Sequence, residues 1–183
     1  YLVDSGGQYL YGTTDVTRTL SLDVQNHKIK EIFTRVLKGH IAVASFKLNK
    51  NSYGDRIDQS ARKFLKDVNL DYPHGTGHGV GYFSNVHEGP QAISRGNRVK
   101  FKEGMITSNE PGYYKKNQFG IRIENLLYVK KIRNKLKFEN LTLVPIDKTL
   151  IEKELLTSFE KDWLNKYHQK VFNFLKGFMN RLE

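Results

Sequence analysis

The chain has 183 residues, a length typical of one domain. Hydrophobic residues make up 38% of it and aromatic residues 12%, which is enough for a core and excludes an intrinsically disordered chain. Cysteine is absent, so disulfides, thiolate metal sites and a cysteine nucleophile are excluded. The net charge of +11 comes from scattered lysines and arginines, which favours a solvated basic surface over a nucleic-acid partner.

The sequence also bears on location and completeness. No apolar run approaches the ~20 residues that cross a bilayer, so we expect no membrane partner. The lack of disulfides fits the cytoplasm, which is the location we expect. The chain begins at Tyr1 and leads at once into a polar motif, so we interpret it as a fragment of a longer protein.

The first predicted elements are two short strands in residues 1–22, joined by a turn at Gly6–Gly7. From Asn26, the expected N-cap, apolar residues recur at intervals of three and four and predict a helix. After a loop at residues 51–54, the same spacing predicts a second helix. The apolar residues of the two helices are Ile29, Ile32, Phe33, Val36, Leu37 and Ile41, followed by Ile57, Ala61, Leu65 and Val68.

The middle of the chain is rich in glycine. After Pro73 comes HGTGHGVG, which is too flexible for a helix interior and predicts a loop. Residues 105–108 predict a short strand that ends in a turn at residues 109–112. Apolar and polar residues alternate through residues 119–129, which predicts one strand with Arg122 on one of its faces.

The C-terminal part completes the predicted fold. Further strand is predicted at residues 136–144. The segment 157–183 opens with a capping box formed by Thr157 and Glu160, and continues as an amphipathic helix. We therefore predict a single α+β domain over residues 1–183, whose sheet presents a site on one face.

Four acidic residues occupy positions where a structural role is unfavourable. Asp4 and Asp15 lie in or beside strands, Glu110 precedes a proline turn, and Glu124 interrupts an apolar strand. For any one of them alone a structural explanation is favoured, such as an ion pair between Glu124 and Arg122. Buried carboxylates are costly unless they are paired or bound to a metal, so the four together favour a metal site.

Three histidines strengthen this interpretation. His74, His78 and His87 fall within 14 residues, although the chain has only 6 histidines. A lone histidine is more often structural, but three in a glycine-dense loop indicate a functional site. The intervening glycines would allow backbone and imidazole groups to approach a ligand closely.

Four segments resemble, in the same order, the motifs of the aminopeptidase P family of pita-bread metallopeptidases. They are DSGGQYLYGTTDVTRT, HGTGHGVGYFSNVHEGP, NEPGYY and FGIRIEN. The resemblance extends to DWLNKYH near the C-terminus and covers nearly the whole chain. It implies a curved, mostly antiparallel sheet covered by helices, in a catalytic domain whose N-terminal part is missing from this chain.

The resemblance also implies a cofactor. Its five metal-ligand positions fall on Asp4, Asp15, His78, Glu110 and Glu124, with Asp15 and Glu124 bridging two divalent ions. Four carboxylates balance the charge of two such ions. An oxygen-rich ligand set with one imidazole and no sulfur suits Mn2+, with Co2+, Fe2+ or Zn2+ as alternatives.

The implied reaction is hydrolysis of the bond between an N-terminal residue and a following proline, by a hydroxide that bridges the two metals. Glu110 would steer the proton, and His87 would hydrogen-bond the developing oxyanion. His74 would line the pocket for the proline ring. Arg122 is a candidate for orienting the carboxylates and binding substrate. Because relatives carry a further substrate-binding histidine upstream of Asp4, we expect activity from the parent protein rather than from this piece.

Several alternatives stay open. Prolidase and methionine aminopeptidase share the fold and the ligand types, but SNVHEGP and NEPGYY favour aminopeptidase P. A non-catalytic pita-bread binding module is disfavoured because all five ligand positions are present. The expected partners are peptides with proline second. A homodimer is a further option, to which Trp163, Phe174 and Phe178 could contribute, although an aromatic helix is more often core.

Overall fold

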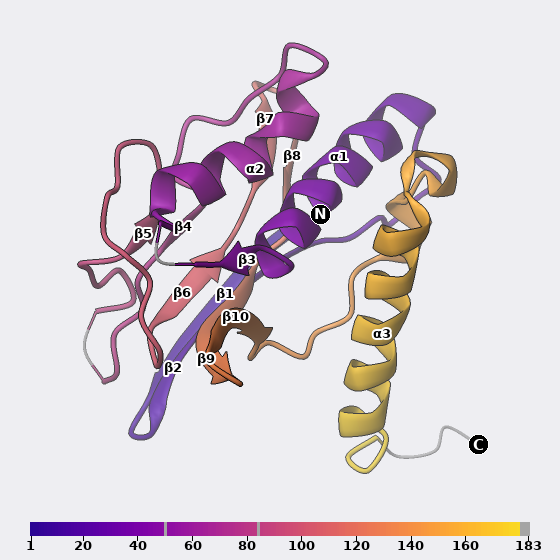
Figure 1. The fold of residues 1–183 in the computed structure, drawn as a ribbon. Coiled ribbons are helices and arrows are strands. Elements are labelled where there is room, and N and C mark those ends of the chain that lie inside the picture. The colour runs from indigo at the N-terminus through magenta and orange to yellow at the C-terminus, as the bar shows by residue number, and fades with distance from the viewer. Residues whose placement is uncertain (50, 84, 180–183) are drawn as a thin grey trace.

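The structure is a computed structural model that describes residues 1–49, 51–83 and 85–179. Within these ranges, strands and helices alternate as Figure 1 shows. The elements in chain order are β1 (Leu2–Tyr9), β2 (Gly12–Thr19), α1 (His27–Ala44), β3 (Lys47–Leu48), α2 (Gly54–Lys66), β4 (Gly77–His78), β5 (Ala92–Ile93), β6 (Ile106–Asn109), β7 (Gly112–Lys115), β8 (Phe119–Arg122), β9 (Asn125–Ile132), β10 (Lys135–Asn140), the short 3-10 helices η1 (Lys148–Leu150) and η2 (Lys153–Leu155), and α3 (Ser158–Leu175).

Strands β1 and β2 form an antiparallel hairpin whose turn lies at Leu10–Tyr11. The turn predicted at Gly6–Gly7 is therefore wrong, because both glycines lie inside β1. A Cβ on the first glycine would lie 3.1 Å from the carbonyl oxygen of Thr14, and one on the second would lie 2.9 Å from the ring of Tyr9. Close contact, rather than a turn, accounts for the two glycines.

The two predicted helices are confirmed as α1 and α2, which lie side by side (Figure 1). The side chain of Asn26 caps α1 by accepting a hydrogen bond from the backbone N–H of Ile29 at 3.0 Å, as predicted. Gly39 lets the helices approach, since a Cβ there would lie 2.5 Å from the carbonyl oxygen of Ala61. Helix α2 ends at Lys66, so Val68 follows the helix rather than extending its face.

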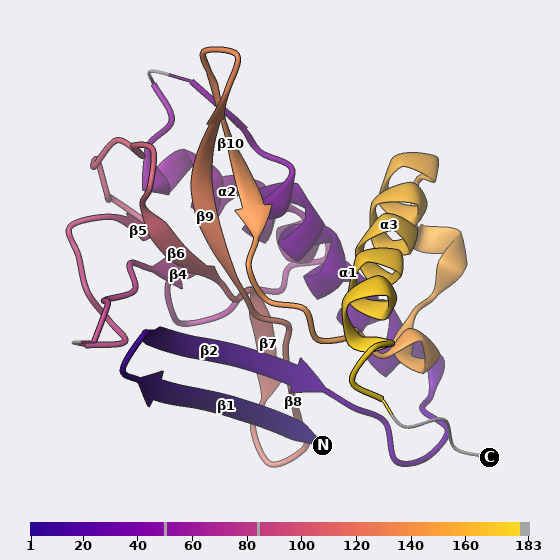
Figure 2. The same cartoon turned by 90° about the horizontal axis from the view of Figure 1, so that it is seen from below.

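All paired strands in the described residues are antiparallel. A four-stranded sheet has the order β3-β10-β9-β6. In Figure 2 the pair β4-β5 lies beside β6, and the pairs β7-β8 and β1-β2 lie below the sheet, away from the tip of the β9–β10 hairpin. The single strand predicted over residues 119–129 is instead two strands, broken at Ile123–Glu124. There the backbone N–H of Ile123 donates to the carbonyl of Pro111, and that of Glu124 donates to the carbonyl of Thr17. The pairing partner changes at this point, because β8 pairs with β7 and β9 pairs with β6. The strand predicted at residues 136–144 corresponds to β10, which ends at Asn140.

Two apolar clusters form the core. One packs α1 against α3, β8 and the segment before α3, with Phe33, Ile121 and Leu164 buried. The other packs the end of α1 against α2, β9 and β10, with Ile57 and Leu127 buried. Burial of these side chains supplies the main stabilisation of the strands and helices that carry the site.

Helix α3 begins with the predicted capping box, in which Thr157 and Glu160 exchange hydrogen bonds. It ends at Leu175, and residues 180–183 of the predicted helical segment lie outside the described residues. Trp163 packs against both apolar clusters, whereas Phe174 and Phe178 are exposed. No described helix is long and apolar enough to cross a bilayer.

Candidate metal centre

One cavity of about 510 Å³ collects the five residues that the motifs assign to metal binding. They reach it from separate elements of the fold: the β1–β2 hairpin, β4, the turn after β6 and the break between β8 and β9. In Figure 2 the hairpin lies beside β7 and β8, which brings its aspartates toward the glutamates. The five residues are Asp4, Asp15, His78, Glu110 and Glu124.

His78 stands at the centre of the carboxylates. Its Nε2 atom lies 3.4 Å from an oxygen of Asp15 and 3.3 Å from an oxygen of Glu110. Its Nδ1 atom lies 2.9 Å from the carbonyl oxygen of Gly79, which can only accept, so Nδ1 carries the proton of the neutral ring. The lone pair of Nε2 then faces two carboxylate oxygens, and this arrangement requires a proton or a metal ion between them.

A group of three residues could hold a single ion. Ligand atoms of Asp15, His78 and Glu124 all lie within 4.8 Å of one another. Oxygen and imidazole donors at such spacing suit a divalent transition metal, because Zn2+ and related ions bind these atoms at about 2.0–2.2 Å. The donor chemistry of the residues therefore fits a divalent metal.

The raised pKa values of two of the acids also favour a bound cation. Glu124 is 2% exposed, and its burial, followed by the nearby carboxylates of Glu110, Asp15 and Asp4, raises its pKa to about 8. A hydrogen bond of 2.6 Å from the hydroxyl of Thr17 acts in the opposite direction. Burial also raises the pKa of Glu110. These carboxylates lack sufficient positive charge within the protein, and a bound cation would supply it.

Asp4 is placed differently from the other acids. It lines the cavity but is outside the group of three, and its carboxylate accepts a hydrogen bond of 2.5 Å from Arg122. Arg122 also donates from Nε to the hydroxyl of Thr17 at 3.0 Å, and that hydroxyl donates to Glu124. Arg122 thus touches Asp4 directly and Glu124 through Thr17, as expected of a side chain that orients carboxylates.

The two remaining histidines occupy different positions. His87 lines the cavity, and its ring centroid lies 4.0 Å from that of His78 at an angle of 62°. His74 does not line the cavity among the described residues. Its Nδ1 atom lies 2.7 Å from the carbonyl oxygen of Gly75, and its Nε2 atom lies 2.8 Å from the hydroxyl of Tyr114.

The bond to Tyr114 connects His74 to the site. Because the carbonyl of Gly75 can only accept, Nδ1 of the neutral ring carries the proton and Nε2 accepts from the hydroxyl of Tyr114. Arg122 in turn donates to that hydroxyl oxygen at 2.8 Å. Burial lowers the pKa of His74, which favours this neutral form. His74 is therefore joined to the carboxylates by two side chains rather than by direct contact.

Sequence reasoning missed three supporting residues: Thr17 and Ser108 donate to the acids, and Tyr114 joins Arg122 to His74. The hydroxyl of Ser108 donates to Glu110 at 2.9 Å and accepts from the backbone N–H of His78 at 2.9 Å. Thr17 and Tyr114 lie within the motif segments DVTRT and NEPGYY, so their positions carried a signal. Their roles depend on partners that are distant in the sequence.

Comparison with known proteins identifies the family. The model of metallopeptidase family M24 matches residues 1–131, and the model of the C-terminal region of peptidase M24 matches residues 134–183. A probable Xaa-Pro aminopeptidase P from Fusarium vanettenii is 49% identical over 97% of this chain and 30% of its own length. Aminopeptidase P2 from Arabidopsis thaliana is 48% identical over 94% of this chain and 26% of its own length.

Solved structures agree. An X-prolyl aminopeptidase from Caenorhabditis elegans, described as a cytosolic enzyme with a di-nuclear active site, has a TM-score of 0.91 at 41% identity, covering 97% of this chain and 30% of that one. A prolidase from Pyrococcus furiosus has a TM-score of 0.69 at 29% identity, covering 77% and 40%. The chain spans less than a third of the length of the aminopeptidases. It belongs to metallopeptidase family M24 and has the pita-bread fold.

Proposed function

We propose that the protein containing this chain is a metal-dependent Xaa-Pro aminopeptidase, which removes an N-terminal residue that precedes proline. One observation carries the proposal: the Nε2 atom of His78 lies within 3.4 Å of carboxylate oxygens of both Asp15 and Glu110. The names of the relatives from Fusarium vanettenii, Arabidopsis thaliana and Caenorhabditis elegans support the substrate class. From the nematode relative we also propose a cytosolic location.

The proposed cofactor is a pair of divalent ions, which would supply Lewis acidity and lower the pKa of water toward ~7. The residues that would hold them are those that line the cavity: Asp4, Asp15, His78, Glu110 and Glu124. We propose Mn2+ because the donor set is oxygen-rich, has one imidazole and contains no sulfur.

Glu110 is the proposed general acid and base. Its carboxylate is fixed by Ser108 and lies beside His78, and burial raises its pKa above that of an ordinary glutamate. A carboxylate with a raised pKa accepts a proton from water more readily at neutral pH. It would then deliver that proton to the nitrogen of the departing proline.

His87 is the proposed oxyanion donor. Its ring is exposed at the wall of the cavity and packs against the edge of His78, so it can reach a substrate in front of the carboxylates. An N–H placed there would hydrogen-bond the carbonyl oxygen of the scissile bond as negative charge develops on it.

His74 and Arg122 are proposed to act on the substrate side of the site. Both ring nitrogens of His74 are occupied by Gly75 and Tyr114, which leaves the ring carbons for contact with a proline ring. Arg122 keeps Asp4 and Glu124 in place and can reach the same substrate. Residues 1–183 are proposed to form part of one catalytic domain.

The test is metal-dependent release of the first residue from an Xaa-Pro-Pro peptide by the full-length protein, with Xaa-Ala-Pro as the control substrate. We expect Mn2+ to stimulate release that is selective for proline. An Xaa-Pro dipeptide separates the proposal from a prolidase, because a prolidase would prefer the dipeptide. Absence of release while Mn2+ is shown by calorimetry to bind would contradict the assignment as an enzyme.

A further inference from the structure

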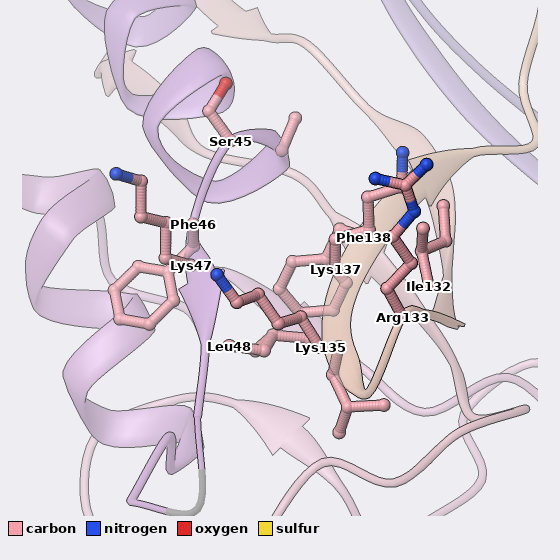
Figure 3. A pocket seen from close by; sticks show the side chains of 11 residues that line it. Ser45, Phe46, Lys47, Leu48, Ile132, Arg133, Lys135, Lys137 and Phe138 are labelled. Carbon is pink, nitrogen blue, oxygen red and sulfur yellow. The ribbon is translucent and has the colours of Figure 1, made fainter.

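A second hollow lies on a different part of the molecule and shares no lining residue with the metal centre. It has a volume of about 580 Å³ and runs between β3 with the end of α1 and the β9–β10 hairpin. We call it the hairpin groove, and Figure 3 shows it from close by. Figure 2 shows the β9–β10 hairpin projecting on the side opposite to the β1–β2 hairpin, which carries Asp4 and Asp15.

The wall of the hairpin groove is apolar. Leu48 and Phe138 are 7% and 6% exposed and form part of the second core cluster, and Phe46 and Leu136 pack against that cluster. Ile132, near the tip of the hairpin, is 39% exposed. An aliphatic or aromatic side chain of a partner would be removed from water there.

The groove is also basic, and its charges are aligned by strand register. Lys137 is the direct register partner of Lys47 on β3 and of Lys130 on β9. Residues directly opposite in an antiparallel pair have Cβ atoms about 4.5–5.5 Å apart, and like charges in such pairs are destabilising. Two such pairs occur here in one row.

Only one lysine of this row is neutralised. Lys130 forms an ion pair of 3.0 Å with Glu139, whereas no described residue pairs within 4.0 Å with the other cations of the groove. Those cations are Lys47, Arg133, Lys135 and Lys137. Among the residues that the structure describes, none that lines the groove is acidic. The unneutralised charge is therefore complementary to an anionic partner.

The tip of the hairpin is held in one conformation. Arg133 and Asn134 both have positive φ, 46° and 63°, which matches the tight two-residue turn that follows the twist of a hairpin. The turn and the strand register therefore set the spacing of the backbone positions that carry the basic residues on the two strands. A binding surface that is already ordered loses less conformational entropy when a partner binds.

We propose that the hairpin groove binds an acidic, extended segment of another protein that carries an aliphatic or aromatic anchor. Neighbouring residues of a strand point to opposite faces, so Leu48 and Leu136 lie on one face of the β3–β10 pair and Lys47 and Lys137 on the other. An extended segment added to β3 alternates in the same way, so its anchor meets the apolar face and its carboxylates meet the lysines. Strand β3 lies at the edge of the sheet and, among the described residues, pairs only with β10. Its free side can add the backbone of an extended segment. An apolar concave wall and an open strand edge favour a polypeptide over nucleic acid or a lipid surface.

The experiment measures fluorescence anisotropy of the peptide acetyl-Asp-Phe-Glu-Leu-Asp-Leu-Glu, whose acidic and apolar residues alternate as an extended segment requires, labelled with fluorescein, upon titration with the full-length protein. The acetyl group and the lack of proline keep it from being a substrate. We expect saturable binding that weakens as salt rises, because screening acts within about 10 Å at 0.1 M salt. A peptide with Gln and Asn in place of the acids, and one with Ser in place of Phe and Leu, should each bind more weakly.

Charge reversal locates the site. The double variant Lys47→Glu and Lys137→Glu should weaken binding by roughly tenfold or more, and both positions are exposed, so the fold should tolerate it. The matched control is Lys63→Glu with Lys161→Glu, which changes net charge equally at exposed positions on α2 and α3. The control should bind the peptide within about twofold of wild type.

Three outcomes would overturn the proposal: no binding of the acidic peptide, equal loss in both double variants, or tighter binding of an oligothymidine or of phosphatidylserine vesicles. Equal loss would mean that net charge alone attracts the peptide. Thermal melting of each variant verifies the fold. The binding result is independent of peptidase activity, so failure of one assignment leaves the other intact.

Discussion

Two clusters of buried charge lie close together in this fold and are balanced in opposite ways. In the first, Arg62 donates to Asp58 at 2.8 Å, to Asp71 at 2.7 Å and to the backbone carbonyls of Tyr72 and His74. In the second, the acids around His78 outnumber the basic groups that reach them. Arg95 lies 3.9 Å from the other oxygen of Asp71, so two cations face the two carboxylates of the first cluster. The first cluster is therefore neutralised within the chain, and the second is not.

The pKa values report this difference. Hydrogen bonds and the charge of Arg62 lower the pKa of Asp71 against the opposing effect of burial, whereas burial and like charges raise the pKa of Glu124 to about 8. Carboxylates with an internal partner are structural, and carboxylates without one are prepared for an external cation. A sequence pattern alone does not separate the two, because both clusters combine acids with histidine-containing loops.

The largest expected effect comes from removing a proposed catalytic acid. Changing Glu110 to Gln should lower kcat for an Xaa-Pro-Pro peptide by roughly 10³–10⁴, because the group that moves the proton is lost. The control is Glu139→Gln, a partly exposed glutamate paired with Lys130, whose change should leave kcat within about twofold. A Glu110 variant with normal kcat would remove this residue from the mechanism.

Breaking the neutralised cluster around Arg62 should lower the free energy of unfolding. Replacing Arg62 with Leu leaves Asp58 buried without its cation, and should cost about 3–5 kcal/mol in the free energy of unfolding. Urea denaturation of the full-length protein measures the loss. Adding Asp58→Asn to the variant should recover part of it, because the unpaired charge is then removed. A loss below about 1 kcal/mol would show that the pair is not needed for stability.

Local structure was predictable where neighbouring residues determine it. The Asn26 cap, the Thr157 capping box and the buried faces of α1 and α2 follow from spacing within a few residues, and they are confirmed except at Val68, which follows the end of α2. The break at Ile123–Glu124 was not predictable, because it arises from backbone bonds to Pro111 and Thr17, which the alternation of side chains does not contain.

The candidate site divides in the same way. The five proposed ligands could be named because the ordered motifs mark them, and the fold collects all five in one cavity. The residues that hydrogen-bond these ligands could not be predicted, because their partners are far away in the sequence. The bond from Arg122 to Thr17, for example, joins residues 105 apart. A threonine in a strand is ordinary by composition, and only the tertiary fold places its hydroxyl against Glu124.

A smaller effect is expected at the wall of the metal centre. Changing His87 to Ala should lower kcat for the Xaa-Pro-Pro peptide by roughly 10²–10³ if the ring donates to the developing oxyanion. The residue is exposed, so thermal stability should be unchanged. His27→Ala, an exposed histidine at the start of α1, is the matched control. A variant in which KM rises while kcat is unchanged would assign His87 to ground-state binding instead.

The smallest expected effect is a dependence of stability on pH, which tests whether the carboxylate of Glu124 lacks an internal cation. Glu124 has a folded-state pKa of about 8, above the ordinary value of 4.5, so the metal-free folded state binds more protons than the unfolded state between these values. Its contribution therefore makes stability fall as pH rises, by roughly 1 kcal/mol per pH unit. The window of pH 7–8 is the one to measure, because the buried His40 and the half-buried His74, whose pKa values are lowered, are largely neutral there in both states. Against the effect of burial, the hydrogen bond to Asp15 and the carboxylate of Glu110 raise the pKa of His78, which adds a slope of the same sign. Glu124→Gln should remove the part of the slope that comes from Glu124, and Mn2+ should reverse the slope in the wild type, since the ion binds the ionised carboxylates. A slope that is equal in wild type and variant would mean that Glu124 is already ionised in the metal-free protein and that the cavity is neutralised from within.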